Sequence, residues 1–231
     1  MQFQDASILV TGGGTGIGFA TAERLRARGA KVAICGRRPD VIEEAATSIG
    51  ALGLTCDVSD EAQVHALVSS VVERHGRLDA LVNNAAFGYF APLVELDVGR
   101  FDELFATNVR GAMLVGRASA QQMMKSKGGT ILNVGSTAAS KGFPGGSAYA
   151  ASKFALTGLT ECWRAELRPH NIRVMQVNPS EVITPFGGRA SLEEQPSKLR
   201  PVDVAQVIES CLELDDRGFV TQTTLWATNP Q

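Results

Sequence analysis

The chain reads ILVTGGGTGIG at residues 8–18, where a short apolar run passes directly into a glycine-rich turn. Glycines let the backbone turn tightly against a pyrophosphate, and a helix starting there presents free N–H groups and its positive dipole end to the anion. Such a pattern is also typical of structural turns, but this one lies within a strand–helix–strand unit of about 30 residues. It therefore predicts a dinucleotide-binding unit, whose phosphate-binding residues would be Gly12, Gly14, Thr15, Gly16, Ile17 and Gly18.

Short apolar runs alternate with amphipathic stretches along the rest of the chain. We expect strands at 6–11, 31–35, 52–56, 80–83, 129–135, 173–178 and 221–227, and helices at 16–28, 40–49, 59–75, 98–125, 147–169 and 201–214. Most of the strands are continuously apolar, as strands buried on both faces should be. With right-handed crossovers, this order predicts one α/β domain over residues 1–231, a Rossmann-like doubly wound parallel sheet of about seven strands with helices on both faces.

Composition excludes several classes of protein. The 22 Lys and Arg against 24 Asp and Glu give a net charge of −2, which argues against a general nucleic-acid binder. No apolar run approaches the ~18 residues of a membrane span, and the N-terminus lacks the basic region of a secretory signal. The four cysteines are far apart and the three histidines have no metal-ligand spacing, so neither disulfides nor a metal site is expected. We expect a soluble, cytoplasmic protein that acts on a small molecule without nucleic-acid or membrane partners.

Motifs downstream of the glycine-rich turn point to one family. Asn83-Asn84-Ala85-Ala86 follows the expected strand 80–83, and Pro179-Ser180-x-Val182-x-Thr184 follows the expected strand 173–178. Between them, in order, lie Asn108, Ser136, Tyr149 and Lys153. Together with the spacing of Gly12, Gly16 and Gly18, these motifs resemble the short-chain dehydrogenase/reductase family over nearly the whole chain. Within it, the chain looks closest to small NADP-dependent 3-oxoacyl-carrier-protein reductases and related ketone reductases.

The resemblance implies a carbonyl–alcohol oxidoreductase with four catalytic residues. Tyr149 would donate or remove the proton during hydride transfer, and Ser136 would position the substrate oxygen. Lys153 lies on the same helical face as Tyr149, where its ammonium is expected to lower the tyrosine pKa from about 10 and to hold the nicotinamide ribose. Asn108 matches the family's proton-relay asparagine, which would hold a water connected to Lys153; a helix-kink or core amide is the alternative, and both roles could coexist.

The cofactor is expected to be NADP(H) rather than NAD(H). NAD-preferring sites usually place an acidic residue at the end of the second strand, but here Gly36 occupies that place and Arg37 and Arg38 follow it. Arginine offers a planar fork of donors to a 2′-phosphate, whereas a solvated basic turn and NAD dependence remain the alternatives. The resemblance adds Asp57 and Val58 at the adenine and, as further cofactor contacts, Asn84, Ala85, Tyr149, Lys153, Pro179, Val182 and Thr184.

Two positions depart from the family motifs, and the substrate side is less defined. Ala86 and Ser180 each replace a motif glycine; a methyl at 86 is tolerable if φ is negative, while Ser180 leaves the local backbone open. The long segment 179–200 contains Gly187 and Gly188, which suit either hinges of a lid or a surface connector. Phe87, Tyr89 and Phe90 suggest an apolar mouth, although core packing explains them equally well.

Assembly and alternative functions complete the expectations. In the family, helices such as 98–125 and 147–169 form the main dimer face. Small and apolar residues recur in them at helical spacings, namely Ala112, Leu114, Leu156, Leu159 and Trp163. These residues suggest a homodimer or homotetramer; the alternative is that they pack only against their own sheet. A non-catalytic nucleotide sensor or scaffold is the alternative on the same fold, and a sugar-nucleotide epimerase relative would need a larger C-terminal region. The sequence does not indicate which substrate is used.

Overall fold

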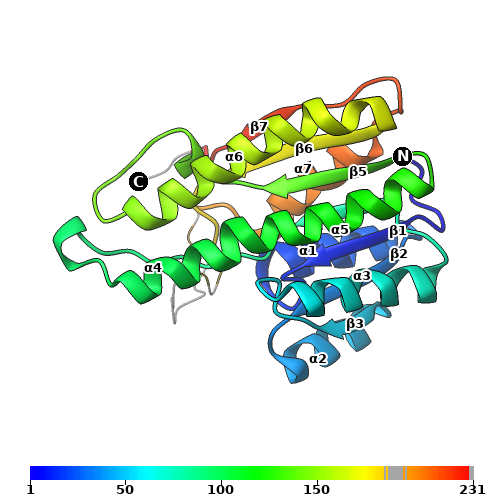
Figure 1. Ribbon diagram of the computed structural model, residues 1–231, viewed down its shortest axis with the longest axis horizontal. Coiled ribbons are helices and arrows are strands. Elements are labelled where there is room, and N and C mark those ends of the chain that lie inside the picture. Colours follow the sequence, from blue (N-terminus) through cyan, green and yellow to red (C-terminus); the bar gives the residue numbers. More distant parts are fainter. Residues whose placement is uncertain (185, 187–194, 196, 229–231) are drawn as a thin grey trace.

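A computed structural model describes residues 1–184, 186, 195 and 197–228 and confirms the expected α/β class. In the described residues, seven parallel strands form a sheet in the order β3-β2-β1-β4-β5-β6-β7 (Figure 1). The strands are β1 (Ser7–Thr11), β2 (Lys31–Gly36), β3 (Leu52–Thr55), β4 (Ala80–Asn83), β5 (Gly129–Val134), β6 (Ile172–Pro179) and β7 (Gln222–Leu225). Because the strand order reverses between β1 and β4, a crevice for ligands is expected at the carboxyl ends of these two strands.

The helices lie where the sequence predicts them, with one interruption described below. They are α1 (Gly16–Ala27), α2 (Pro39–Ile49), α3 (Glu61–His75), α4 (Val98–Phe105), α5 (Ala112–Lys125), α6 (Ser147–Leu167) and α7 (Pro201–Glu213). Short helical turns are η1 (Leu93–Glu95), η2 (Ala106–Gly111), η3 (Thr137–Ala139) and η4 (Arg168–His170). Within the described residues, no helix combines the length and the apolar composition that a membrane crossing requires.

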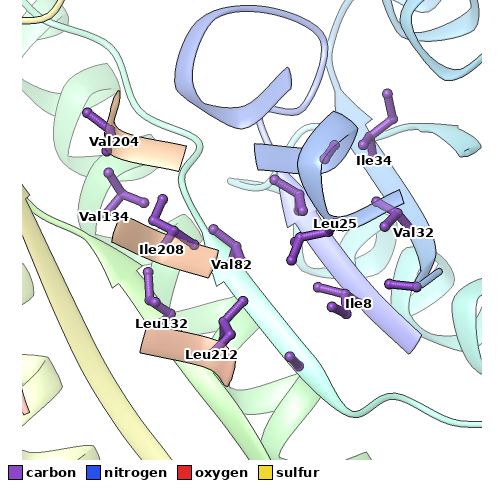
Figure 2. Close-up of a cluster of buried hydrophobic side chains, with 14 of the residues drawn as sticks. Ile8, Leu25, Val32, Ile34, Val82, Leu132, Val134, Val204, Ile208 and Leu212 are labelled. Atoms are coloured by element: carbon purple, nitrogen blue, oxygen red, sulfur yellow. The ribbon is translucent and has the colours of Figure 1, made fainter. Parts of the chain in front are cut away.

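Each face of the sheet has its own hydrophobic core. Ile8 of β1 packs with Leu25 of α1 and Ile208 of α7 in one cluster (Figure 2). Leu9, the next residue along β1, points to the opposite face and packs with residues of α3 and α5. All of these side chains are almost completely buried, and burying each contributes about 1.5–3 kcal/mol. The continuously apolar strands thus hold a helical layer on both faces.

The expected helix 98–125 is not a regular α-helix throughout. Its middle, η2, is a π-helical turn, in which the backbone hydrogen bonds span five residues instead of four. A π-turn inserts an extra residue, so α4 and α5 continue with a changed register. Asn108 lies inside this turn and is buried.

The residues expected at a subunit face are mostly buried in the chain itself. Ala112, Leu114 and Leu156 are 5%, 5% and 2% exposed, so the alternative of packing within the chain is correct for these three. Trp163 packs its ring at Gly116 of α5, where a Cβ would lie 3.0 Å from the indole. The close approach of α6 to α5 therefore depends on the small residue at 116.

The long segment after β6 begins and ends in regular backbone pairing. Val182 and Leu199 form an isolated parallel bridge, in which Ile183 donates to Leu199 O at 2.8 Å and Leu199 donates to Glu181 O at 3.0 Å. A salt bridge of 3.0 Å between Lys198 and Glu181 adds to this closure. The expected hinge glycines, Gly187 and Gly188, lie outside the described residues.

Candidate active site

The glycine-rich turn lies between the carboxyl end of β1 and the amino end of α1, where the sequence places it. Gly16 has φ +56°, and a Cβ at Gly18 would lie 2.3 Å from the carbonyl oxygen of Gly12. No side chain caps α1, and its first turn contains no acidic residue. In the described part of the chain, the first N–H groups of α1 therefore remain available to an anion.

Asn84 and Ala85 hold this turn against β4. Asn84 Nδ2 donates to the carbonyl oxygens of Thr11 at 2.9 Å and Gly12 at 3.3 Å. Thr11 Oγ1 accepts from the backbone N–H groups of Asn84 and Ala85, each at 2.9 Å. These two residues were expected to contact the cofactor, and the contacts in the structure are to the turn that would hold it. Ala86 has a negative φ, so the condition for tolerating its methyl group is met.

The end of β2 presents two free cationic side chains. Arg37 and Arg38 are exposed, and neither guanidinium group forms a hydrogen bond or ion pair with any described residue. Gly36 lies against Ile42 of α2, so that a Cβ there would lie 3.0 Å from Ile42 Cδ1. The guanidinium groups are thus available to a phosphate beside α2.

Asp57 and Val58 follow β3 and have different surroundings. Asp57 Oδ1 accepts from the backbone N–H of Ser59 at 2.9 Å and from its hydroxyl at 2.7 Å, which makes this carboxylate part of a local turn. Val58 is buried at 6% exposure and contacts Gly111, where a Cβ would lie 2.8 Å from Val58 Cγ2. Both side chains therefore already have structural roles, while the second carboxylate oxygen of Asp57 accepts no hydrogen bond from the described residues.

The structure brings Ser136, Tyr149 and Lys153 together. Ser136 lies just after β5, with its side chain close enough to Tyr149 to influence the tyrosine pKa. Lys153 follows Tyr149 by one turn of α6, with its Nζ 5.8 Å from the centroid of the tyrosine ring. Lys153 is 3% exposed, and its ammonium donates to Val134 O at 2.9 Å. Further donors of this buried ammonium have no protein acceptor among the described residues.

The pKa of Tyr149 shifts in the direction opposite to the expected one. Burial raises the pKa of Tyr149, and the neighbouring Ser136 side chain opposes this increase without reversing it. Burial also penalises the charge of Lys153 and lowers the lysine pKa to about 8. The lysine has therefore already lost its charge at the pH where the tyrosine would ionise, so it does not lower the tyrosine pKa. The protein alone therefore holds Tyr149 as a neutral hydroxyl, which is the form that donates a proton.

Asn108 uses its side-chain amide within the protein. Its Oδ1 accepts from Phe87 N at 3.0 Å, and its Nδ2 donates to Phe87 O at 3.0 Å and to Ser152 Oγ at 3.2 Å. The amide therefore anchors the segment after β4 to α6, as the core-amide alternative predicts. A water relay at this residue would have to use its backbone instead.

Sequence reasoning missed the residues that hold Ser136. The Ser136 N–H donates to Asn178 Oδ1 at 3.1 Å, and Gln176 Nε2 donates to the same oxygen at 2.7 Å and to Thr157 Oγ1 at 2.9 Å. Gly135 makes this contact possible, because a Cβ there would lie 2.0 Å from Asn178 Oδ1. The signal that could have identified them is the presence of Gln176 and Asn178 in β6, a fully buried and mostly apolar strand.

The segment after β6 reaches back over the glycine-rich turn. Thr184 lies beside Gly16, where a Cβ would be 3.1 Å from Thr184 Cγ2. Pro179 ends β6, and Val182 forms the bridge with Leu199. Ser180, the second departure from the family motif, donates its N–H to Leu225 O at 2.8 Å and accepts from Ala227 N at 3.2 Å. Its side chain therefore holds the end of β7.

Aromatic rings surround Tyr149. Phe90 and Phe186 each meet its ring edge-on, with centroids 5.5 Å apart in both pairs. Of the three aromatic residues expected at a mouth, only Phe90 takes this position. Tyr89 instead accepts from Asp97 N at 2.9 Å and lies under the guanidinium of Arg100, next to α4.

Comparisons with known proteins cover nearly the whole chain. Residues 6–195 match the family model described as short chain dehydrogenase. A sepiapterin reductase from Chlorobaculum tepidum is 33% identical, with 96% of each chain covered. An alcohol dehydrogenase from Thermococcus sibiricus, solved with 5-hydroxy-NADP, superposes with a TM-score of 0.90 at 27% identity, covering 98% of this chain and 97% of that one. A 3-ketoacyl-(acyl-carrier-protein) reductase from Brucella melitensis, solved with NADH, gives 0.91 at 29%, covering 99% and 100%.

Proposed function

The chain belongs to the short-chain dehydrogenase/reductase family and is an oxidoreductase acting on CH–OH donors, and on that premise we propose that it interconverts a ketone and a secondary alcohol with NADP(H). The observation that carries the proposal is the meeting of the Ser136 and Tyr149 side chains beside the buried ammonium of Lys153. We further propose that residues 1–231 act as one catalytic domain. The non-catalytic sensor is disfavoured because these three reactive groups are all present and adjacent.

The residues along the carboxyl edge of the sheet fit a nicotinamide dinucleotide. The uncapped start of α1 would bind its pyrophosphate, the spare donors of Lys153 its nicotinamide ribose, and Arg37 and Arg38 a 2′-phosphate. Thr184, beside Gly16, lies at the same edge. When bound, the cofactor supplies or accepts the hydride. NAD(H) is the competing cofactor, because one similar protein was solved with NADH, and the assay described below therefore tests both cofactors.

Each reactive group has a defined task in this proposal. Tyr149 donates its proton to the carbonyl oxygen during reduction, and its raised pKa keeps that proton in place at neutral pH. Ser136 hydrogen-bonds the same oxygen, and its backbone is fixed by Asn178. Asn108 positions the segment that carries Phe87, and in this structure we assign it an anchoring task.

A turnover assay tests the proposal directly. Purified protein is mixed with ketones and 3-oxoacyl thioesters, with NADPH or NADH, and the absorbance of the reduced nicotinamide is followed. We expect at least one ketone to be reduced, and Tyr149→Phe to lower the rate by a factor of about 10²–10⁴, because the ring stays and only the proton donor is lost. NADPH binding, measured by titration, should change little. Turnover of Tyr149→Phe at the wild-type rate would falsify the assignment.

A further inference from the structure

Three phenylalanines from three separate loops form a chain of ring contacts with Tyr149, in which Phe90 and Phe186 touch the tyrosine and Phe143 touches Phe90. Phe90 follows β4, Phe143 precedes α6 and Phe186 follows β6. Phe90 also contacts Phe143, with ring centroids 6.1 Å apart and planes tilted by 42°. The rings therefore form a continuous aromatic surface that starts at the proposed proton donor. We call Phe90, Phe143 and Phe186 the aromatic triplet.

The backbone is shaped to hold these rings. A Cβ at Gly88 would lie 2.6 Å from Phe186 Cε1 and 2.8 Å from Phe90 Cε2, so both rings need a glycine there. A Cβ at Gly146 would lie 2.5 Å from Phe143 Cζ. The backbone hydrogen bond from Ala91 N to Gly145 O, 2.9 Å long, ties two of the loops together.

Two of the rings face solvent. Phe90 is 46% exposed and Phe143 is 45% exposed, although both are large apolar side chains. Ring centroids 4.5–7 Å apart in tilted or edge-to-face geometry are favourable, and a further ring can extend such a stack. A substrate whose oxygen meets Tyr149 has to place its substituents next to this surface.

The aromatic triplet itself is uncharged, since it consists of phenylalanine rings. Among the described residues, neither Tyr149 nor Lys153 takes part in an ion pair, and the ammonium of Lys153 donates to a backbone carbonyl. An anionic substituent such as a carboxylate, packed against the rings, would lose hydration and meet only their negative faces.

We propose that the aromatic triplet is the substrate-recognition surface, and that the substrate is a ketone or alcohol that carries no negative charge and has an aromatic or alicyclic ring next to the reacting carbon. The inference rests on the proposed function, since it takes Tyr149 as the group that meets the substrate oxygen. It deepens that function by naming the chemical class of the substrate.

Three ketones separate ring recognition from other effects: acetophenone, 2-butanone and 4-acetylbenzoate, which is acetophenone with a carboxylate. We expect wild-type kcat/KM to be at least tenfold higher for acetophenone than for either of the others. Phe90→Leu and Phe143→Leu keep an apolar side chain and remove the ring. Each should lower the ratio of kcat/KM for acetophenone to that for 2-butanone at least fivefold. Phe101→Leu, which breaks a stacked pair with Phe105 in α4, is the matched control and should leave the ratio unchanged.

An unchanged ratio in both loop variants, or equal use of 4-acetylbenzoate and acetophenone, overturns the proposal while leaving the reductase function intact. Calorimetric binding of 1-phenylethanol and 2-butanol to the protein with NADP⁺ covers the case in which no ketone is reduced. Binding of the ring alcohol that Phe90→Leu weakens at least fivefold would then support the aromatic triplet and reject the reductase function. Equal binding of both alcohols, or none, would overturn ring recognition as well.

Discussion

Arg37 and Arg38 leave the end of β2 with two guanidinium groups that no described side chain neutralises. A charge-assisted hydrogen bond to a phosphate is worth roughly 1.5–3 kcal/mol, or about ten- to a hundredfold in affinity. Arg37→Ala should therefore weaken NADPH by that factor and NADH by much less. Titration of both nucleotides against the wild type and the variant checks this. Equal losses would show that Arg37 does not contact a 2′-phosphate.

Lys153 makes stability depend on pH in a direction set by its burial. The pKa of Lys153 is lowered to about 8 in the folded protein from the ordinary 10.5, so between these values the folded chain releases a proton that the unfolded chain keeps. Stability rises with pH wherever the unfolded state binds more protons, and here the gain between pH 7 and 9.5 is about 2 kcal/mol. Below pH 8 both states carry the charge, and the folded state bears the full cost of burying it.

Lys153→Met isolates this effect. The variant should be more stable than the wild type at pH 7, because it removes a buried charge, and its advantage should shrink by about 2 kcal/mol at pH 9.5. Urea unfolding of both proteins at the two pH values provides the measurement, and the tyrosines common to both proteins cancel. A difference in unfolding free energy that stays constant with pH would contradict the buried-ammonium assignment.

At the scale of elements, α1 and α7 are joined across one face of the sheet by a nearly buried carboxylate. Glu209 of α7 is 7% exposed and accepts from Arg24 Nε at 2.6 Å and from Arg28, both of α1. Removing it leaves Arg24 without its acceptor and leaves Arg28 with Glu213 alone, so Glu209→Ala should lower the unfolding free energy by about 1–3 kcal/mol. Glu213→Ala is the control, since Glu213 pairs with Arg28 at the exposed end and should matter far less. Equal effects in chemical denaturation would refute this coupling.

How much the sequence reveals also differs among elements. The positions of β1, β4 and β6 were predictable, because a run of apolar residues is visible in the local sequence. This holds even though the strands pack against residues that are distant in the chain. The π-helical turn η2 was not, because an extra residue in a helix changes hydrogen-bond partners without changing residue types. The aromatic triplet was only partly foreseen, since Phe90, Phe143 and Phe186 meet through the fold and not through spacing. Asn108 was identified by resemblance, yet its hydrogen bonds to Phe87 depend on that same turn.

At the scale of the whole molecule, apolar side chains are exposed on α6, at the start of α4 and on the turn before α4. Phe154 of α6 is 48% exposed, and Leu93 and Val98 are 75% and 72% exposed. We expect a homodimer or homotetramer that covers part of this surface, with Phe154→Arg shifting the mass toward the monomer. Light scattering at micromolar concentration gives the mass directly. Glu44→Arg on α2, which adds an arginine elsewhere on the surface, should leave it unchanged. A wild-type monomer would contradict the expectation.

The bridge between Val182 and Leu199 has a consequence for how this scaffold can diversify. Backbone atoms make its hydrogen bonds, so they form whatever side chains lie between the two ends. Each doubling of the enclosed segment adds only about 0.6 kcal/mol of closure entropy. Segments of different length and composition can therefore be exchanged between Thr184 and Ser197 at small thermodynamic expense, while the sheet, the glycine-rich turn and Tyr149 stay in place. A single scaffold of this kind can acquire new substrate selectivity by exchange of this one segment, while the rest of the fold is retained.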